Sequence, residues 1–354
     1  MITDAKILIC YNAPVSIFSV YNGKAQDENI EKYDLSEKSF SMELNNIKRA
    51  LGKYFTHVDT LAVDMDVQKT IDGINSAHPD VIFNFVESVE GITAYEFCIA
   101  GLYELLGYFY TGCAPSSLGN CLNKARTKDI LNSFGINTPR YLTLKANQRF
   151  TQKDINLNYP VILKLLREDA SIGISEFSVV NNYTELNKQF KFLSETYKQE
   201  IILEEYIKGR ELNVAILGGE PLPVSEINFE GLPEGYPKIV TYDGKWIENS
   251  IYFNFTNPVC PANISKSVQS EIYKIAKESF TAMNCRDYAR IDIRLTNKNI
   301  PFVIEVNPNP DLSTDSGFSR SAKAGGIEHP ELLSTIVNYA LQRKTLHDTK
   351  IKAG

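Results

Sequence analysis

The stretch that decides the fold is YARIDIRLTNKNIPFVIEVNPNPDLS, residues 288–313. Two apolar runs within it have the character of β-strands, and the short polar turn TNKN between them predicts an antiparallel hairpin. Side chains alternate between the two faces of a strand, so Arg290 and Asp292 share one face of the first run. Glu305 and Asn307 share one face of the second run in the same way. We therefore expect charged and amide side chains to gather on one side of an otherwise apolar hairpin.

This grouping predicts a metal site. Carboxylate and amide oxygens suit a hard cation, chiefly Mg²⁺, which Asp292, Glu305 and Asn307 would hold. Arg290 beside them would suit a phosphate that the same cation bridges. The alternative is a hairpin with one solvated face, on which these charges only meet water. The second strand is apolar apart from Glu305 and Asn307, and this favours the metal site.

Length and composition are those of an ordinary globular protein. The chain has 354 residues, 43% of them hydrophobic and 23% charged, and this length suits two or three domains. The net charge of −6 gives no reason to expect a nucleic-acid partner. No apolar run approaches the roughly 18 residues of a membrane span, and the first residues lack the pattern of a signal peptide. We expect a cytoplasmic protein without a membrane partner.

Cysteine and histidine give no sign of a zinc site. The cysteines form no C-x-x-C pair and the histidines show no metal-ligand spacing. We expect free thiols in a reducing compartment. The residues concerned are Cys10, Cys98, Cys113, Cys121, Cys260 and Cys285, and His57, His78, His329 and His347.

The first third of the chain alternates strand-like and helix-like segments. Strands are expected at 6–11, 58–64 and 80–86, and helices at 39–55 and 94–107. This order predicts a parallel sheet flanked by helices. Ligands of such sheets bind at the carboxyl ends of the strands.

The remainder predicts a more mixed arrangement of helices and strands. The polar tail after Arg343 is expected to be frayed. The expected elements are a helix from 122 that ends at Gly135, a strand after Pro139, a strand–loop–strand over 159–180, a helix over 183–197, two strands joined by a kink over 200–219, and helices over 267–284 and 330–343.

The segment RIDIRL…PFVIEVNPNP resembles the metal-binding end of ATP-grasp enzymes, in particular the D-alanine–D-alanine ligase-like branch. Other segments resemble the same branch in the same order, so the resemblance covers nearly the whole chain. These segments are YTGCAPSSLGNCLNKARTK (110–128), YPVILKLLREDASIGIS (159–175), IILEEYIKGRELNVAIL (201–217) and the substrate-covering loop YDGKW (242–246).

The resemblance implies an α/β protein whose C-terminal part is α+β. It implies an N-terminal parallel αβ substrate domain (1–121), a small central α+β lobe (122–213) and a C-terminal α+β lobe with the magnesium site (214–354), with the nucleotide between the last two. It also implies ATP and Mg²⁺ as cofactors, with two ions bound and Mn²⁺ as a substitute. The partners it implies are small-molecule carboxylate and amine substrates, and the family precedent favours a homodimer.

Several nucleotide contacts follow from the resemblance. Lys124 and Lys164 would contact the phosphates, since a point charge on a flexible stem suits phosphate oxygens. Glu204, Glu205 and Ile207 would line the adenine slot, with Glu204 accepting from the adenine amino group. The alternatives are a snorkelling lysine at a strand end for Lys164 and a solvated acidic turn for the glutamates.

The resemblance also implies contacts to the ribose and the triphosphate. Glu211 would accept from the ribose hydroxyls. The loop EDASIGIS (168–175), which contains Ser171, would close over the triphosphate, because small residues let backbone N–H groups approach phosphate oxygens. Lys245 would reach the terminal phosphate, the alternative being an ordinary solvated lysine. Arg290 and the metal ions would neutralise the transferring group.

The chemistry that the resemblance implies is amide formation. A carboxylate attacks the γ-phosphate to give an acyl phosphate, and an amine then displaces the phosphate. No protein nucleophile is needed, and the sequence offers no Ser–His or Cys–His arrangement. The alternatives are a kinase-like phosphotransferase and a non-catalytic nucleotide-binding protein. Turnover that needs both an acid and an amine would distinguish the ligase from the phosphotransferase.

The substrate side departs from the branch at its start. The glycine-rich GGxSxE turn, whose glutamate holds the first amino acid, is absent, and the acidic residues between Asp27 and Glu37 are candidates to replace it. Glu87 stands in place of the histidine of an HG pair. Trp246 stands in place of a tyrosine.

Further departures follow the metal asparagine. Asp311 stands in place of the glycine of a PG pair, while Ser316 still falls near the serine that binds the second substrate. We therefore expect the same machinery acting on substrates other than a D-alanine pair. Glu87, with Glu90 close by, would recognise an ammonium, amidine or guanidinium group. Alternatively, both glutamates cap the next helix.

Overall fold

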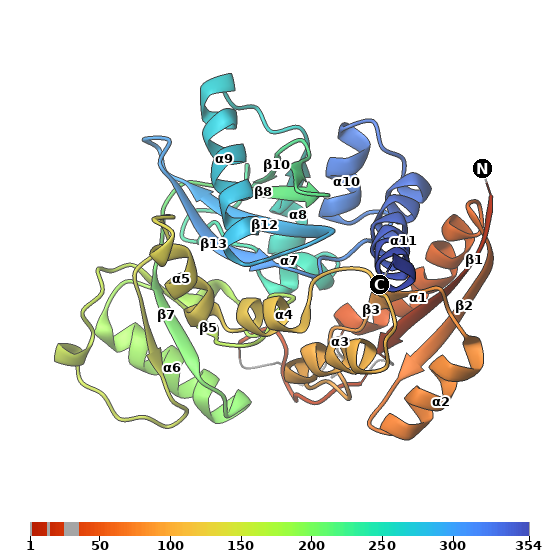
Figure 1. The fold of residues 1–354 in the computed structure, drawn as a ribbon. Helices are drawn as coiled ribbons and strands as arrows, with labels where there is room; N and C mark the ends of the chain where they lie inside the picture. The colour runs from red at the N-terminus through yellow and green to blue at the C-terminus, as the bar shows by residue number, and fades with distance from the viewer. Residues whose placement is uncertain (1, 13–14, 25–34, 354) are drawn as a thin grey trace.

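The computed structural model describes residues 2–12, 15–24 and 35–353 and contains three β-sheets (Figure 1). The first sheet is parallel, with strand order β2-β1-β3, as the alternating first third predicts. Its strands are β1 (Thr3–Asn12), β2 (Phe55–Val63) and β3 (Val81–Phe85), and its neighbouring helices are α1 (Leu35–Leu51), α2 (Val67–Ala77), the short helix η1 (Thr93–Tyr95), α3 (Glu96–Leu105) and α4 (Pro115–Leu122).

Both faces of the parallel sheet are covered, which explains the uninterrupted apolar run of β1. Ile7 and Ile9 pack into one hydrophobic cluster together with the C-terminal helices. Leu8 and Cys10, which point the other way, pack into a second cluster with α3 and α4. Parallel sheets are typically buried on both faces in this way.

The second sheet is antiparallel, with strand order β4-β7-β5-β6, and lies at the far end of the molecule from the parallel sheet (Figure 1). Helix α6 packs on it through Leu186, Phe190 and Leu193, in one cluster with Val161 and Leu203. The elements here are α5 (Lys124–Ser133), β4 (Tyr141–Leu144), η2 (Gln152–Asp154), β5 (Val161–Leu165), η3 (Glu176–Ser178), β6 (Val179–Val180), α6 (Tyr183–Tyr197) and β7 (Ile201–Glu205).

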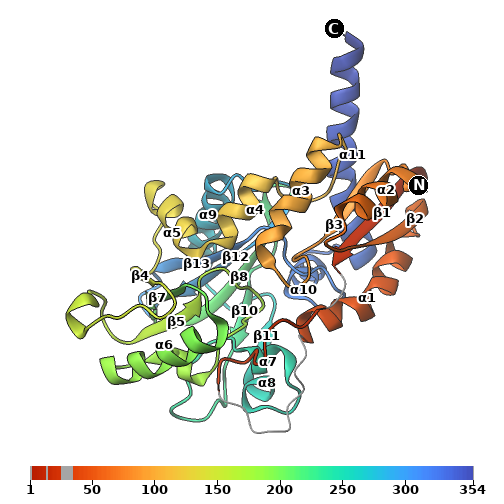
Figure 2. The ribbon, with the colours of Figure 1, turned by 90° about the horizontal axis from the view of Figure 1, so that it is seen from below.

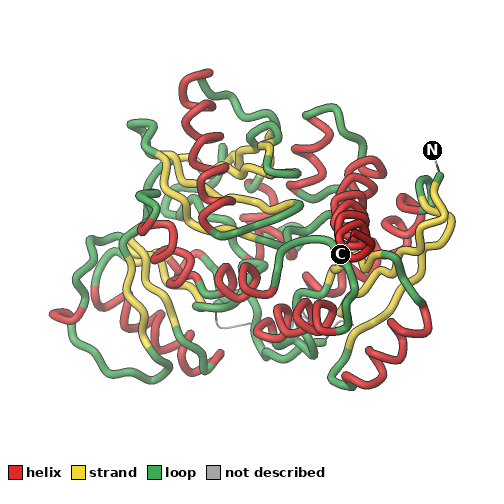
Figure 3. The backbone as a smooth tube through the Cα atoms, viewed as in Figure 1, coloured by secondary structure: helices red, strands yellow, loops and turns green. Residues whose placement is uncertain are grey.

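The third sheet contains the hairpin and follows the order β11-β10-β8-β12-β13, with β9 paired to β8. Helices α9 and α5 cover one face of it, and Figure 3 shows these helices against the strands. The elements are β8 (Arg210–Leu217), β9 (Glu220–Pro221), β10 (Ser225–Asn228), α7 (Tyr242–Trp246), α8 (Ile251–Phe255), β11 (Asn257–Val259), α9 (Lys266–Ala282), β12 (Tyr288–Leu295) and β13 (Pro301–Asn307). Strand β8 spans residue 213, and the division of the chain at 121 and 213 stays a prediction.

The chain ends in α10 (Gly317–Ala324) and α11 (His329–Ala353). The expectation of a frayed tail after Arg343 is wrong, because α11 continues for ten residues beyond it and projects from the body of the protein (Figure 2). Two ion pairs hold the helix at this point, Arg343 with Asp287 and Lys344 with Asp80. Among the described helices, none combines the length and the apolar character needed to cross a membrane.

Candidate active site

A cavity of about 710 Å³ is lined by both antiparallel sheets and by the carboxyl ends of the parallel strands. Sixteen residues that the sequence predicts for the site line it, whereas Glu90, which was expected beside Glu87, does not. The predicted residues are Glu87, Lys124, Lys164, Ser171, Glu204, Glu205, Ile207, Glu211, Lys245, Trp246, Arg290, Asp292, Glu305, Asn307, Asp311 and Ser316. Their individual roles stay predictions.

The hairpin places its polar face into this cavity. Asp292 is the direct cross-strand partner of Glu305, and Arg290 is that of Asn307. Asp292 is only 7% exposed, so the alternative of a solvated hairpin face is wrong. Its Oδ1 accepts from Arg290 Nε at 2.7 Å and from Asn213 Nδ2 at 2.7 Å, and its Oδ2 accepts from Arg290 Nη2 at 2.8 Å. Arg290 thus supplies the positive charge beside Asp292.

The donor set of the hairpin fits a magnesium ion that is shared with a phosphate. Within the described part of the chain, no three acidic, histidine or cysteine side chains are grouped to hold a metal by themselves. Mg²⁺ is commonly held by one or two carboxylates together with substrate phosphates and water. Asp292 and Glu305 with the amide of Asn307 match that description. Each oxygen has two lone pairs, so the existing bonds of Asp292 leave acceptor capacity.

Lys124 joins the hairpin to the loop 168–175. Its Nζ donates to Glu168 O at 2.6 Å and lies 3.3 Å from Asp169 Oδ1 and 3.7 Å from Glu305 Oε1. Burial acts to raise the pKa of Glu305, but Lys124 and then Lys164 outweigh it and lower this pKa to about 2. Burial raises the pKa of Asp169 to about 6 against the opposing effect of Lys124. The sequence prediction missed Asp169, which holds the lysine that would meet a phosphate.

Glu204 lies between two lysines at the base of the cavity. Its Oε1 is 3.1 Å from Lys128 Nζ and its Oε2 is 3.1 Å from Lys164 Nζ. Burial acts to raise the pKa of this carboxylate, but Lys128 and then Lys164 lower it. The role of Glu204 as an acceptor for adenine stays a prediction, and both of its oxygens already have cationic partners. Lys128 was missed, although its spacing of four residues from Lys124 places both on one helix face.

The residues predicted to bind the ribose and to line the adenine slot also form hydrogen bonds with other residues of the protein. Arg294 Nη1 donates to Glu211 Oε2 at 2.9 Å, and Arg294 Nε donates to Ile207 O at 3.0 Å. Glu205 Oε1 accepts from Asn158 N and Nδ2, both at 2.9 Å. The strand β8 residue Asn213, which binds Asp292, was missed, although its spacing of two from Glu211 places both on one face of the strand.

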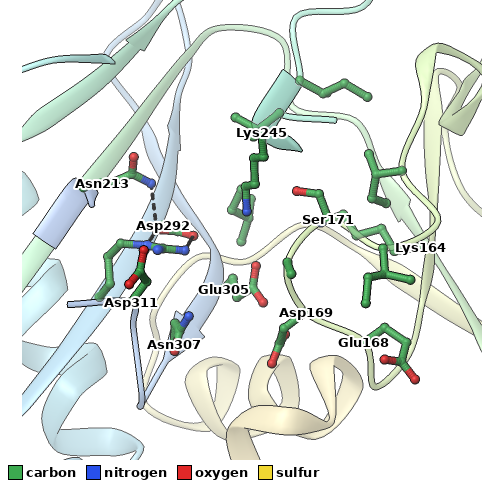
Figure 4. A pocket seen from close by; sticks show the side chains of 18 of the residues that line it. Lys164, Glu168, Asp169, Ser171, Asn213, Lys245, Asp292, Glu305, Asn307 and Asp311 are labelled. Atoms are coloured by element: carbon green, nitrogen blue, oxygen red, sulfur yellow. Dashed lines mark hydrogen bonds and ion pairs between the residues drawn. The ribbon is translucent and has the colours of Figure 1, made fainter. Parts of the chain in front are cut away.

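Lys245 extends from α7 into the space between Ser171 and Asp292 (Figure 4). No hydrogen bond or ion pair joins its ammonium to another described residue. Burial within the cavity wall, followed by the nearby Arg290, lowers the pKa of Lys245. The expected loop YDGKW is a short helix, and Trp246 Nε1 donates to Ala170 O at 3.1 Å.

The loop 168–175 carries two consecutive residues in the left-handed region. Ala170 has φ 53° and Ser171 has φ 62°. Side chains other than glycine are uncommon there and are found at ligand clamps, among other sites. This conformation places Ser171 on the cavity wall beside Lys245 (Figure 4).

The substrate side of the cavity is formed by β3, the segment after β13 and α10. The backbone N of Glu87 donates to Asn12 Oδ1 at 3.1 Å, which joins the ends of two parallel strands. Asp311 Oδ1 accepts from Ser313 N at 2.8 Å. Ser316 caps α10, its Oγ accepting from Ser319 N at 3.1 Å.

The structure bears on two further predictions for this side. The capping alternative for Glu87 and Glu90 is wrong, because the cap positions of η1 and α3 are Ile92 and Tyr95. The candidates between Asp27 and Glu37 cannot be placed, since 25–34 and the side chains of 36–42 lie outside the described residues. A missed carboxyl group, Glu96, is buried and accepts from Asn309 Nδ2 at 3.2 Å, and burial raises its pKa.

Comparison with known proteins gives concordant results. A family model described as the D-ala D-ala ligase C-terminus matches residues 130–338. An uncharacterized protein of Sinorhizobium fredii, y4sG, is 32% identical over 267 residues, covering 74% of this chain and 75% of that protein. The D-alanine–D-alanine ligase of Nitrosospira multiformis is 31% identical over 242 residues, covering 68% of this chain and 74% of the ligase.

A solved structure shows the same fold. The D-alanine–D-alanine ligase of Bacillus anthracis, crystallised with ATP, superposes with a TM-score of 0.74 at 23% identity, covering 98% of this chain and 100% of that one. The likeness extends over all three sheets described above. The parallel sheet, the small antiparallel sheet and the hairpin sheet therefore form one known architecture.

Proposed function

This chain belongs to the family of the D-ala D-ala ligase C-terminus, within the ATP-grasp superfamily, and we propose that it joins a small carboxylic acid to an amine in a pairing other than D-alanine with D-alanine. As a member of that family it is an ATP-dependent C–N ligase. The observation that carries the substrate part of the proposal is the cavity itself. Its nucleotide end contains the lysines, carboxylates and arginine that the family chemistry needs. Its substrate end contains Glu87 and Asp311, and the junction of the two ends contains Trp246, where the family pattern has other residues.

In the first step the carboxylate of the acid substrate attacks the γ-phosphorus of ATP, and ADP leaves. Lys124 and Lys164 orient the phosphates, and Lys245 neutralises charge on the γ-phosphate. Mg²⁺, held by Asp292, Glu305 and Asn307, would neutralise charge on the transferring phosphoryl group. Two such ions, with Mn²⁺ as a substitute, are part of the proposal. The product of this step is an acyl phosphate.

In the second step the amine attacks the carbonyl carbon of the acyl phosphate, and phosphate leaves. Arg290 would stabilise the tetrahedral oxyanion, because a fixed cation in a cavity stabilises charge that develops in the transition state. The guanidinium of Arg290 is paired with Asp292 in the structure, so it must share or leave that partner. The loop 168–175 and α7, which are joined through Trp246 and Ala170, would exclude water from the acyl phosphate.

The substrate end supports a cationic group on one of the two substrates. Glu87 lines the cavity at the carboxyl end of β3, where ligands of parallel sheets bind. Asp311 lines the same cavity. A carboxylate accepts hydrogen bonds from an ammonium, amidine or guanidinium group, whereas it would repel a second carboxylate. Ser316, at the start of α10, would contact the other substrate.

A phosphate-release screen with Mg-ATP and pairs of amino acids, small carboxylates and amines tests this function. We expect release that requires both an acid and an amine, and a product mass equal to the sum of the two substrates less one water. A phosphorylated acid as the end product would show a phosphotransferase instead. Efficient formation of D-alanyl-D-alanine would contradict the substrate proposal and leave the ligase assignment intact.

A further inference from the structure

The segment of residues 15–24, here called the strap, leaves the parallel sheet after β1 and runs beside α7 (Figure 2). Tyr21 OH accepts from the backbone N of Ile17 at 2.8 Å and of Phe18 at 3.1 Å, which folds the strap on itself. The ring of Tyr21 is stacked on that of Tyr242 in α7 at a centroid distance of 5.9 Å. The strap therefore connects the substrate domain with α7, from which Lys245 extends.

The strap also contacts the loop 168–175 through its backbone. Gly173 N donates to Tyr21 O at 2.7 Å, and Ser175 Oγ donates to Gly23 O at 3.2 Å. A Cβ atom on Gly23 would lie 2.1 Å from Gly173 O, and Gly23 has φ +70°. The two backbones approach too closely for a side chain at this position. The strap and the loop over the proposed triphosphate site thus form one packed unit.

One ammonium joins α7 to the end of that loop. Lys24 Nζ lies 2.7 Å from Asp243 Oδ2 in α7 and 3.2 Å from both carboxylate oxygens of Glu176 in η3. Asp243 is buried, and its Oδ1 has no hydrogen-bond partner among the described residues. Lys24 is therefore the cation that compensates this carboxylate. Burial acts to lower the pKa of Lys24, but Asp243 and then Glu176 raise it, so the ammonium stays charged.

Helix α7 depends on these contacts for its placement. It has five residues, and a helix of that length is not stable without tertiary contacts. Removing the partner of a buried charge leaves the other charge uncompensated, which is strongly destabilising locally. Lys24 does not line the cavity, whereas Lys245, two residues from Asp243, does.

We propose that Lys24 is a positioning residue that, through Asp243 and Glu176, holds α7 and the loop 168–175 together in the arrangement that directs Lys245 at the terminal phosphate. The strap, which belongs to the predicted substrate domain, thereby stabilises the arrangement of α7 and the loop 168–175. This assignment rests on the proposed function for its catalytic consequence, but its structural part can be measured without substrates.

The structural part is tested by hydrogen exchange of the nucleotide-free protein. Lys24→Met should speed exchange at the amides of Gly173, Tyr242 and Ile247 together, while Lys24→Arg should behave as wild type. Lys277→Met, which removes an exposed ion pair with Glu220, is the matched control and should leave these amides unchanged. Unchanged exchange in Lys24→Met, or faster exchange confined to the strap, would overturn the proposal.

The catalytic part is tested by kinetics with the acid–amine pair found in the screen and by equilibrium binding of Mg-ATP. Lys24→Met should lower kcat about tenfold, which corresponds to about 1.4 kcal/mol of activation free energy, and should change the Kd of Mg-ATP less than about threefold. The double variant Lys24→Met with Asp243→Asn should show no larger decrease in kcat than Lys24→Met alone, because the two residues act as a pair.

Three outcomes decide the catalytic part. A wild-type kcat in Lys24→Met, or additive losses in the double variant, would overturn the role of Lys24. Equal losses in Lys24→Arg would also overturn it. Failure of the wild-type protein to bind Mg-ATP would contradict the proposed function, a result that the exchange experiment on the nucleotide-free protein keeps separate.

Discussion

The two ends of the cavity differ in how their charges are arranged. At the nucleotide end, the carboxylates are held in short ion pairs, Glu204 with Lys164 and Asp292 with Arg290. At the substrate end, Asp311 is bound by the backbone and hydroxyl of Ser313. By the sequence resemblance, the nucleotide end follows the family pattern, and the substrate end departs from it. This contrast is the basis of our proposal that the chemistry is shared with the family, whereas the choice of substrates is particular to this chain.

Variants of the metal-site residues in the hairpin should have the largest effect on the chemistry proposed for the nucleotide end. Asp292→Asn or Glu305→Gln should lower Mg-ATP-dependent turnover about 1,000-fold, because the phosphoryl transfer loses a group that stabilises developing charge. The circular dichroism spectrum should stay that of the wild type. Glu220→Gln, a carboxylate of the same sheet that lies outside the cavity lining, is the control and should keep full turnover. Wild-type rates in either hairpin variant would contradict the metal assignment.

A second test concerns the pairing at the nucleotide end. Glu204→Gln should lower the free energy of unfolding by about 3 kcal/mol at pH 7, because it leaves Lys128 and Lys164 without their buried partner. The folded-state pKa of Glu204 is lowered, so the stability from this pair is present above the unfolded-state pKa and is lost as the pH falls through the folded-state value. Urea unfolding between pH 7 and 3 measures this.

The Glu204→Gln variant should therefore lose less stability than wild type on acidification. The difference in unfolding free energy between the two proteins should be largest near neutral pH and should shrink in acid. A difference that is constant across this range would show that the charge of Glu204 is not what stabilises the nucleotide end.

The substrate end is tested by Glu87→Gln. We expect kcat/KM for the cationic substrate to fall about 30-fold, since a hydrogen bond to a charged group contributes roughly 1.5–3 kcal/mol, while KM for ATP changes little. Glu90→Gln is the matched control, because Glu90 lies close in sequence but does not line the cavity. An equal loss of kcat/KM in Glu87→Gln and Glu90→Gln would show that Glu87 has no specific role in binding the cationic substrate. A raised KM for ATP in Glu87→Gln would show that Glu87 acts at the nucleotide end of the cavity and not at the substrate end.

The smallest effect is expected at the junction of the two ends. Trp246→Phe removes the indole N–H that donates to Ala170 O and keeps an aromatic ring. The loss of one neutral hydrogen bond, about 1 kcal/mol, should lower kcat about fivefold. Steady-state kinetics measure this, and an effect larger than that of Glu87→Gln would show that Trp246 does more than join α7 to the loop.

The sequence predicts the fold where burial dictates the pattern. The uninterrupted apolar run of β1 follows from coverage on both faces, and α6 (Tyr183–Tyr197) follows from helical spacing. The extension of α11 escaped prediction, because its ion pairs reach Asp80 and Asp287, which are remote in sequence. Helix α7 escaped prediction because it has only five residues and makes contacts with segments remote in sequence, such as the stacking of Tyr242 on Tyr21 and the ion pair of Asp243 with Lys24.

The candidate site shows the same division. Strand alternation and the resemblance together predict sixteen residues that line the cavity, whereas Glu90, which the sequence also suggested, does not line it. Lys128 and Asn213 could have been found from their spacing to Lys124 and Glu211. Lys24 carries no local signal, since its partners lie more than 150 residues away. Ion pairs between residues so far apart in the sequence depend on the tertiary structure and cannot be predicted from local sequence patterns.

The central step of the proposed reaction is the attack of a carboxylate on the γ-phosphate inside this cavity. The most direct measurement uses the acid substrate labelled with ¹⁸O in its carboxyl group, Mg-ATP and the amine, followed by mass spectrometry of the released phosphate. We predict one ¹⁸O atom transferred to phosphate in each turnover. Phosphate that forms together with the amide but carries no label from the acid would contradict the acyl-phosphate route.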